Sequence, residues 1–356
     1  MYKFIKPEVL KASSYHLADV PARIKINQNE NPFDLPPEIK ERALRILSER
    51  PWGRYPEFVP LRFLKRLSEA VNWPAEGLSV GNGSNELIAA LLAITLERGR
   101  KLLICEPTFS MYRQLATTHA ANVIAVPMTE DFGFDMPAVL EAIEREQPTV
   151  VILCSPNNPT GAWLTFEQMD EIAGRFSGLL IFDEAYFEFC GITALGLVER
   201  HRNVAVLRTF SKAMSLAGLR VGYLMAAAEL VDEVNKAKLP YNLNIFSMIA
   251  AECALDAAAV MQAQVEQIIA GRERLIAALG RIEGVRAYPS RANFVLFETR
   301  LAAEQIYTEL LKRGRILIRN VSRPGRMERA LRVSVGRPDE NDEFLSTLAG
   351  ILGTRG

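Results

Sequence analysis

The chain has 356 residues, of which 49% are hydrophobic and 24% are charged, a composition typical of globular proteins. This length exceeds one ordinary hydrophobic core and predicts two domains. Lys plus Arg and Asp plus Glu both number 42, so the formal net charge is zero and gives no support for a nucleic-acid or membrane-surface partner.

The cysteines and the N-terminal segment favour a cytoplasmic protein. Cys105, Cys154, Cys190 and Cys253 form no Cys-x-x-Cys pair and have no histidine at ligand spacing, which predicts reduced, core-packed thiols and no metal site. The N-terminus lacks an apolar run suited to a signal peptide, and no stretch approaches the roughly 20 apolar residues of a membrane helix. We therefore expect a cytoplasmic location and no membrane partner.

Residues 1–35 are expected to form an N-terminal arm. Prolines at 21 and 32 interrupt this region, prolines at 36 and 37 follow it, and it shows little hydrophobic periodicity. An extended arm of this kind could lie against the body of the protein or reach a partner subunit.

Residues 36–255 are expected to form a large α/β domain. Amphipathic stretches such as 85–97 and 166–176 alternate with short apolar runs. These runs lie at 102–105, 150–155, 179–185 and 204–211. The alternation predicts a mostly parallel sheet covered by helices. A long Ala-rich helical stretch at 228–283, broken near Pro240, is expected to lead out of this domain.

Residues 256–356 are expected to form a small α+β domain. Apolar runs at 292–298, 316–322 and 330–336 surround a helical segment at 304–314. This pattern predicts a mixed or antiparallel sheet with helices.

The segment TFSKAMSLAGLRVGY (209–223) places Ser211 and Lys212 at the end of an apolar strand and Arg220 eight residues after the lysine. Burial at a strand end lowers the pKa of a lysine and makes its amine a nucleophile. The serine hydroxyl and a bidentate guanidinium could hold a phosphate. Taken alone, the Ser-Lys pair is better explained as an exposed turn.

Asp183 follows the apolar run LLIF directly, so it is expected at the carboxyl end of a parallel strand, where ligands bind in open α/β sheets. A carboxylate buried there needs a cationic partner or several hydrogen-bond donors. Tyr186, three residues on, could reach the same pocket. A helix N-cap role for Asp183 is an equal alternative without the other motifs.

Two further segments carry turn or helix-start chemistry. In SPNNPTG (155–161), after the run VVIL, a tight turn could present the amide of Asn158 to a ligand. In GNGSNE (81–86), a helix starting near Ser84 or Asn85 could bind a phosphate through free backbone N–H groups. Alone, each is compatible with a plain turn or a capped helix.

Tyr112 and Arg332 complete the candidate set. Tyr112 could stack on a flat ring, although a lone aromatic is more often part of a core. Arg332, on an expected strand of the small domain, could bind a substrate carboxylate in a cleft, although most such arginines are solvated.

Taken together and in this order, the strings resemble the fold-type I pyridoxal-phosphate aminotransferases, and among them the histidinol-phosphate aminotransferase family. The resemblance covers nearly the whole chain. Its strings are NQNENPF (27–33), RYPE (54–57), GNGSNE, PTFSMY (107–112), SPNNPTG, DEAYFEF (183–189), TFSKAMSLAGLRVGY, ANFVLF (292–297) and LRVSVG (331–336).

The resemblance implies that the cofactor is pyridoxal 5'-phosphate, bound as a Schiff base to Lys212. It implies that Asp183 pairs with the pyridine nitrogen and that Asn158 and Tyr186 contact the phenolic oxygen of the ring. Tyr112 is expected to stack on the ring.

The resemblance also assigns the phosphate of the cofactor to Ser211, Arg220 and the backbone at Ser84 and Asn85. It implies a homodimer in which Tyr55 crosses the interface to the partner's cofactor. The chain would then have one copy of itself as its macromolecular partner.

Substrate binding is implied for four residues. Arg332 resembles the arginine that takes a substrate carboxylate, and Arg319 resembles the one that meets a substrate phosphate. Tyr15 and Asn29 resemble residues of the arm near the substrate.

The implied activity is amino transfer between L-histidinol phosphate and 2-oxoglutarate in histidine biosynthesis. An aromatic aminotransferase or a threonine-phosphate decarboxylase of the same fold are the alternatives among enzymes, since their motifs overlap with these. A ligand-sensing domain without catalysis is the alternative outside enzymes, and it predicts an added DNA-binding module and a basic patch.

Overall fold

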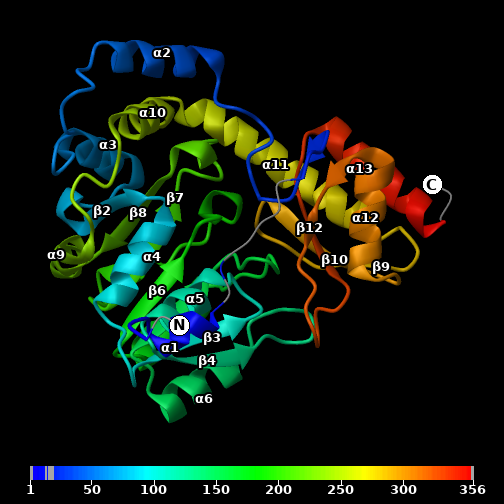
Figure 1. The fold of residues 1–356 in the computed structure, drawn as a ribbon, viewed down its shortest axis with the longest axis horizontal. Helices are drawn as coiled ribbons and strands as arrows, with labels where there is room; N and C mark the ends of the chain where they lie inside the picture. The colour runs from blue at the N-terminus through cyan, green and yellow to red at the C-terminus, as the bar shows by residue number, and fades with distance from the viewer. Residues whose placement is uncertain (1–2, 13, 15–19, 354–356) are drawn as a thin grey trace.

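A seven-stranded sheet and a four-stranded sheet organise the protein. Figure 1 shows the computed structural model. The structure describes residues 3–12, 14 and 20–353. Helices pack on the larger sheet, and a long helix leads from it to the smaller sheet near the C-terminus. The predicted α/β architecture is confirmed.

The larger sheet has the strand order β2-β8-β7-β6-β5-β3-β4. Its strands are β2 (Leu78–Asn82), β3 (Lys101–Glu106), β4 (Asn122–Pro127), β5 (Val150–Cys154), β6 (Leu179–Asp183), β7 (Val204–Thr209) and β8 (Val221–Ala226). The neighbours from β7 to β4 are parallel, and β8 is antiparallel to both β7 and β2. The sheet is therefore mostly parallel, as predicted.

The central strands are apolar except at the carboxyl ends of β6 and β7, because both faces of the sheet are covered. All residues of β5, β6 and β7 are buried. Alternate residues face opposite cores, with Val151 and Leu153 in one and Val150 and Ile152 in the other. The helices of this part are α2 (Pro37–Ser48), α3 (Leu61–Val71), α4 (Ser84–Ala93), α5 (Met111–Thr118), α6 (Met136–Glu146), α7 (Phe166–Arg175), α8 (Leu195–Val198) and α9 (Ala228–Ala237).

The helical stretch predicted to break near Pro240 does so. After α9 the chain continues in α10 (Ile245–Asp256) and α11 (Ala258–Leu279). Among the described helices none alone is long and apolar enough to cross a membrane, although α10 and α11 together pass that test by length and composition across an 80° bend.

The smaller sheet has the order β12-β13-β10-β9, and every pairing in it is antiparallel. Its strands are β9 (Val285–Ala287), β10 (Phe294–Thr299), β12 (Arg319–Asn320) and β13 (Ala330–Ser334), with helices α12 (Ala303–Gly314) and α13 (Pro338–Leu352). Its core also takes in Tyr186 and Phe189 from the loop after β6. The domain limits at residues 35 and 255 stay predictions.

The described part of the arm contacts elements that lie next to each of the two sheets. Helix α1 (Pro7–Lys11) lies near α5, where Lys6 Nζ donates to the carbonyl of Thr118 at 3.0 Å. Strand β1 (Ile24–Lys25) pairs in parallel with β11 (Ile316–Leu317) next to the smaller sheet. The arm is thus built into its own subunit.

A buried ion pair fixes the segment that follows β6. Glu184 is 0% exposed and Arg208 on β7 is 5% exposed. Arg208 Nε donates to Glu184 Oε2 at 2.9 Å, and Glu184 Oε1 accepts from the backbone N–H of Ala194 at 2.6 Å. The Arg208 guanidinium also lies 3.4 Å from the ring centroid of Phe187.

We expect Arg208→Met to lower the free energy of unfolding by about 3–5 kcal/mol, because it leaves the Glu184 carboxylate buried without its cation. Urea unfolding followed by circular dichroism measures this. Arg200→Met is the control, since Arg200 and Asp170 pair at 2.8 Å with side chains 52% and 38% exposed, and it should cost at most about 1 kcal/mol. Equal losses in the two variants would contradict the assigned importance of the buried pair.

Candidate active site

A cavity of about 450 Å³ lies where the carboxyl ends of β5, β6 and β7 meet the start of α4, the arm and the smaller sheet. The parallel strands bring their carboxyl ends to one edge, so residues far apart in sequence meet there. The predicted site residues in its wall are Asn29, Ser84, Asn85, Tyr112, Asn158, Asp183, Tyr186, Ser211, Lys212, Arg220, Arg319 and Arg332.

Two predicted site residues are not in this wall. Tyr15 lies outside the described residues. Tyr55 is 82% exposed and stacks on Tyr241, with ring centroids 4.7 Å apart. Within one subunit, Tyr55 is therefore a surface residue.

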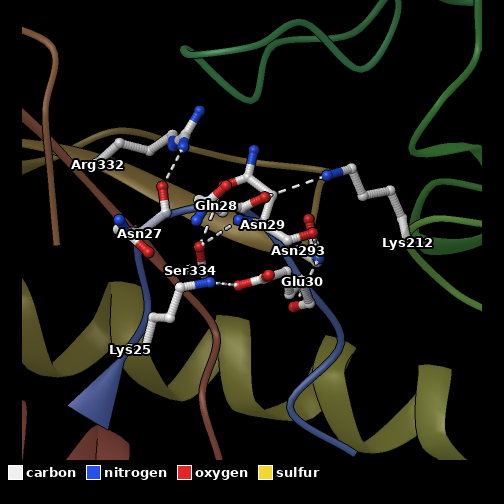
Figure 2. A network of polar contacts seen from close by, with 9 residues as sticks. All are labelled: Lys25, Asn27, Gln28, Asn29, Glu30, Lys212, Asn293, Arg332 and Ser334. Atoms are coloured by element: carbon white, nitrogen blue, oxygen red, sulfur yellow. Dashed lines mark hydrogen bonds and ion pairs between the residues drawn. The ribbon is translucent and has the colours of Figure 1, made fainter. Parts of the chain in front are cut away.

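Lys212 follows the end of β7 and points across the cavity to the arm, where its Nζ donates to the carbonyl of Gln28 at 3.1 Å (Figure 2). Burial is the largest cause that lowers the pKa of Lys212, the positive charges of Arg332 and Arg220 add to it, and the charge of Glu30 opposes it; together they bring this pKa to about 8. A lysine with this pKa is partly neutral near neutral pH and can act as a nucleophile or base.

Asp183, the last residue of β6, is 4% exposed. Its Oδ2 accepts from the hydroxyl of Tyr112 at 2.6 Å, and its Oδ1 accepts from the N–H of Ala185 at 3.1 Å. Burial raises the pKa of Asp183, while these donors and Lys212 oppose the rise. A cationic ring nitrogen in the cavity would complete the set of partners that a buried carboxylate needs.

Tyr112 is placed differently from the prediction that it stacks on the cofactor. It is 0% exposed, its hydroxyl is bound to Asp183, and its ring is edge-on to Phe109 at 5.6 Å. Phe109, three residues earlier, is only partly buried and lines the same cavity. Phe109 thus offers the more open ring face, and Tyr112 holds the carboxylate.

Asn158 is presented to the cavity by its neighbour. Asn157 Nδ2 donates to the carbonyl of Pro107 at 2.8 Å and to Thr160 Oγ1 at 2.9 Å, which fixes the turn after β5. Asn158 Oδ1 accepts from Arg332 Nη1 at 2.5 Å. The turn therefore links the larger sheet to the arginine of β13 across the cavity.

A small concave surface suited to a phosphate lies at the start of α4. Gly83 precedes this helix, and a Cβ on Gly83 would collide with the guanidinium of Arg220. A Cβ on Gly222 would collide with the backbone N of Ser84. Arg220 Nη1 also donates to Ser211 Oγ at 3.2 Å. The glycines thus keep the helix N-terminus, a hydroxyl and a guanidinium close together.

These residues fit pyridoxal phosphate. The buried Asp183 suits its ring nitrogen, Lys212 suits its aldehyde carbon, and Arg220, Ser211 and the N-terminus of α4 suit its phosphate. Among the described residues, no group of His, Cys, Asp and Glu could hold a metal ion.

Arg319 and Arg332 face each other on neighbouring antiparallel strands, β12 and β13, as register partners. Directly opposed residues of an antiparallel pair project to the same face of the sheet, and like charges so placed repel. Both line the cavity, together with the exposed Arg323. This wall therefore favours an anionic ligand.

Several cavity residues escaped the sequence predictions. The carbonyl of Gln28 binds Lys212 and the carbonyl of Asn27 accepts from Arg332 Nη2 at 2.7 Å, and a backbone acceptor leaves no side-chain signal in a sequence. Phe109 and Arg323 also line the cavity. The string PTFSMY contained Phe109, so its ring could have been considered beside Tyr112.

Comparison with known proteins agrees with this geometry. The family described as aminotransferase class I and II matches residues 22–348. A histidinol-phosphate aminotransferase of Chlorobium phaeovibrioides is 37% identical over 353 residues, which are 99% of this chain and 98% of that protein. The histidinol-phosphate aminotransferase 2 of Nitrosococcus oceani is 39% identical over 349 residues, or 97% and 96% of the two chains.

The fold agrees as well. A crystal structure of histidinol-phosphate aminotransferase from Sinorhizobium meliloti in complex with pyridoxal-5'-phosphate superposes with a TM-score of 0.90 at 21% identity, covering 99% of this chain and 98% of that one. The predicted fold class and the predicted resemblance are confirmed. The chain therefore belongs to the aminotransferase class I and II family.

Proposed function

We propose that this enzyme transfers the amino group between L-histidinol phosphate and 2-oxoglutarate, giving imidazole acetol phosphate and glutamate in histidine biosynthesis, with pyridoxal phosphate as cofactor. The observation that carries the proposal is the pair Arg319 and Arg332, opposed on β12 and β13 in the cavity wall. The similarity to proteins named histidinol-phosphate aminotransferase supports it.

The arginine pair favours substrates with an anionic end. Two guanidiniums on one face repel each other until an anion lies between or beside them, and each can bind phosphate or carboxylate bidentately. Histidinol phosphate brings a phosphate, and 2-oxoglutarate brings two carboxylates. An aromatic amino acid carries a single carboxylate with one negative charge, so it would balance less of this positive charge than a phosphate dianion or the two carboxylates of 2-oxoglutarate.

In the proposed mechanism, pyridoxal phosphate supplies the electron sink for the substrate carbanion. Arg220, Ser211 and the N-terminus of α4 hold its phosphate, and Asp183 holds a proton at its ring nitrogen. Tyr112 in turn keeps Asp183 in place through the 2.6 Å hydrogen bond.

Lys212 moves the proton in this mechanism. Its Nζ takes the proton from the α-carbon of the substrate when the amine is neutral. With a pKa of about 8, roughly one tenth of such amines are neutral at pH 7, against well under one in a thousand for an ordinary lysine. Burial and the nearby Arg332 thus prepare the base.

A homodimer is supported by the exposed aromatic surface around Tyr55. Trp52, Tyr55, Phe58 and Tyr241 are 73%, 82%, 68% and 42% exposed, and Tyr55 and Phe58 both contact the ring of Tyr241. A contiguous exposed apolar surface of this kind favours a protein partner. We infer that a second copy covers it and that Tyr55 reaches the partner's cofactor.

The cytoplasm is the proposed location, where the four free cysteines stay reduced. The threonine-phosphate decarboxylase and aromatic aminotransferase alternatives share the fold, so the substrate experiment below separates them. A purely ligand-sensing role is opposed by the lowered pKa of Lys212 next to Asp183, which serves chemistry rather than binding alone.

Absorbance titration of the purified protein with bound cofactor tests the proposal. L-histidinol phosphate should deplete the cofactor band near stoichiometry, L-phenylalanine should do little, and Lys212→Ala should lack the lysine-linked band. A response to phenylalanine alone would indicate an aromatic aminotransferase, and release of carbon dioxide from threonine phosphate would indicate the decarboxylase. If the wild-type protein forms no cofactor band, the proposed function is wrong.

Arg319→Met should lower kcat/KM for histidinol phosphate by about 10- to 100-fold, because it removes a charged hydrogen bond of about 1.5–3 kcal/mol to the phosphate. Steady-state kinetics with histidinol phosphate and with unphosphorylated L-histidinol measure this, and the second donor should be little affected. Arg323→Met is the matched control at the exposed edge of the cavity. A larger effect from Arg323→Met would move the phosphate contact to that residue.

The lowered pKa of Lys212 predicts a pH profile in the cofactor-free protein. The rate of Lys212 acetylation should rise about tenfold per pH unit and level off above about pH 8, because the amine is protonated below its pKa and neutral above it. Peptide mass spectrometry after brief labelling measures the rate. The amine of an exposed lysine side chain should keep gaining reactivity up to about pH 10. The same profile for Lys212 would contradict the lowered pKa.

A further inference from the structure

Asn29 is held in the cavity wall by both its backbone groups. It is 1% exposed and has a left-handed backbone with φ of 55°, which asparagine tolerates better than most residues. Its N–H donates to Ser334 Oγ at 2.8 Å, and its carbonyl accepts from Asn293 Nδ2 at 3.0 Å (Figure 2). The residue therefore has little freedom to move.

The same contacts determine which way the Asn29 amide faces. Ser334 Oγ already accepts the Asn29 N–H, so its single proton is free to be donated, and Asn29 Oδ1 lies 3.1 Å away to accept it. With Oδ1 turned to Ser334, the Nδ2 group faces the opposite way. It donates to the hydroxyl oxygen of Tyr186 at 2.9 Å.

This donor constrains the Tyr186 hydroxyl. An amide NH₂ accepts no hydrogen bond, so Tyr186 cannot donate its proton to Asn29 and must direct it elsewhere. The ring is 4% exposed, packs edge-on against Phe294 at 5.2 Å, and lines the cavity with Lys212 Nζ 5.9 Å from its centroid. The open direction for the proton is the cavity.

We propose that Asn29 is a positioning residue whose amide binds the acceptor side of the Tyr186 hydroxyl and so directs the hydroxyl proton at the ring oxygen of the bound cofactor. This inference rests on the proposed function, which places that oxygen beside Tyr186. It adds to the expectation that Asn29 is an arm residue near the substrate. The arm then acts on the cofactor through the tyrosine.

Other groups near Tyr186 do not supply this orientation. Arg332 on β13 acts on it by charge, as do Asp183 on β6 and Cys154 on β5, and Lys212 lies over the ring. Burial raises the pKa of Tyr186, so the hydroxyl keeps its proton at working pH. Among the hydrogen bonds of the described residues, the amide of Asn29 is the donor on the hydroxyl oxygen.

A double-mutant cycle with the full-length, cofactor-loaded protein tests the inference. Asn29→Asp is isosteric and tolerates the left-handed backbone, but it turns the donor into an acceptor that attracts the Tyr186 proton. Its added charge also acts directly on the cofactor. Tyr186→Phe and the double variant measure that direct effect, so the difference between backgrounds isolates the hydrogen bond.

The readout is the pH midpoint of the cofactor absorbance change. A hydroxyl that donates to the ring oxygen favours its negatively charged form, so Asn29→Asp should raise the midpoint by about one pH unit more in the wild-type than in the Tyr186→Phe background. Equal shifts in both backgrounds would overturn the inference. Ser334→Ala is the control for anchoring of the arm. It should lower Tm with little change in the pH midpoint.

The outcomes separate this inference from the proposed function. Lack of a cofactor band in the wild-type protein would contradict both the proposed function and this inference. A normal band with no coupling between Asn29 and Tyr186 would contradict the inference alone. If Asn29→Asp fails to fold, judged by Tm of the cofactor-free protein, Asn29→Gly takes its place. Glycine accepts the backbone conformation and removes the amide, and a coupling of the same sign is then required.

Discussion

The buried carboxylate of Asp183 is the constraint on which the site depends. Ionised carboxylates are costly to bury without a cation or several donors. Asp183 ends a strand whose residues are all buried, so it cannot turn to water, and the protein gives it two donors, Tyr112 and the N–H of Ala185. The remaining charge faces the cavity, where in the proposed function a protonated ring nitrogen would satisfy it. Tyr112 is thereby committed to the carboxylate, and its ring is not free to stack.

The arm forms the opposite wall of the cavity, and its buried polar groups are also paired. Three successive carbonyls, those of Asn27, Gln28 and Asn29, accept from Arg332, Lys212 and Asn293 at 2.7, 3.1 and 3.0 Å. Buried carbonyls need partners, and each of these partners comes from a different segment of the chain (Figure 2). A strand pairing of two residues with β11 sets the register of this segment. The arm therefore holds Lys212 and Arg332, the proposed base and the proposed substrate arginine, through uncharged backbone carbonyls.

The sequence predicted the fold wherever apolar runs and helical periodicity were strong. β5, β6 and β7 were expected from continuous apolar runs, since parallel strands are covered on both faces. β4 and β8 were missed, because NVIAVP is a short run that lies mostly unburied at the edge of the sheet and VGYLMA was considered as part of the lysine motif. The mostly parallel sheet was predicted, but the reversed strand β8 was not, because strand direction depends on connections that no local pattern records.

The sequence pointed to side chains that the structure brings together, but it did not give their geometry. Lys212, Asp183, Asn158 and Arg332 were found by their position after apolar runs and by the combined motifs, and all line one cavity. The function of Tyr112 was misjudged because a sequence does not tell whether an aromatic ring is open or fully enclosed. The carbonyl of Gln28 could not be found at all, since every residue carries one.

The cavity has an excess of positive charge that anionic ligands would balance. Its described wall holds the cations Lys212, Arg220, Arg319, Arg323 and Arg332 against one carboxylate, Asp183. Assembling like charges in a partly desolvated site lowers the stability of the empty protein, and it is tolerated because anions bound there restore the balance. In the proposed function a cofactor phosphate would meet Arg220 on one wall, which would leave Arg319 and Arg332 on the other for the substrate. The same repulsion that destabilises the empty site thus selects a substrate that carries its own anion.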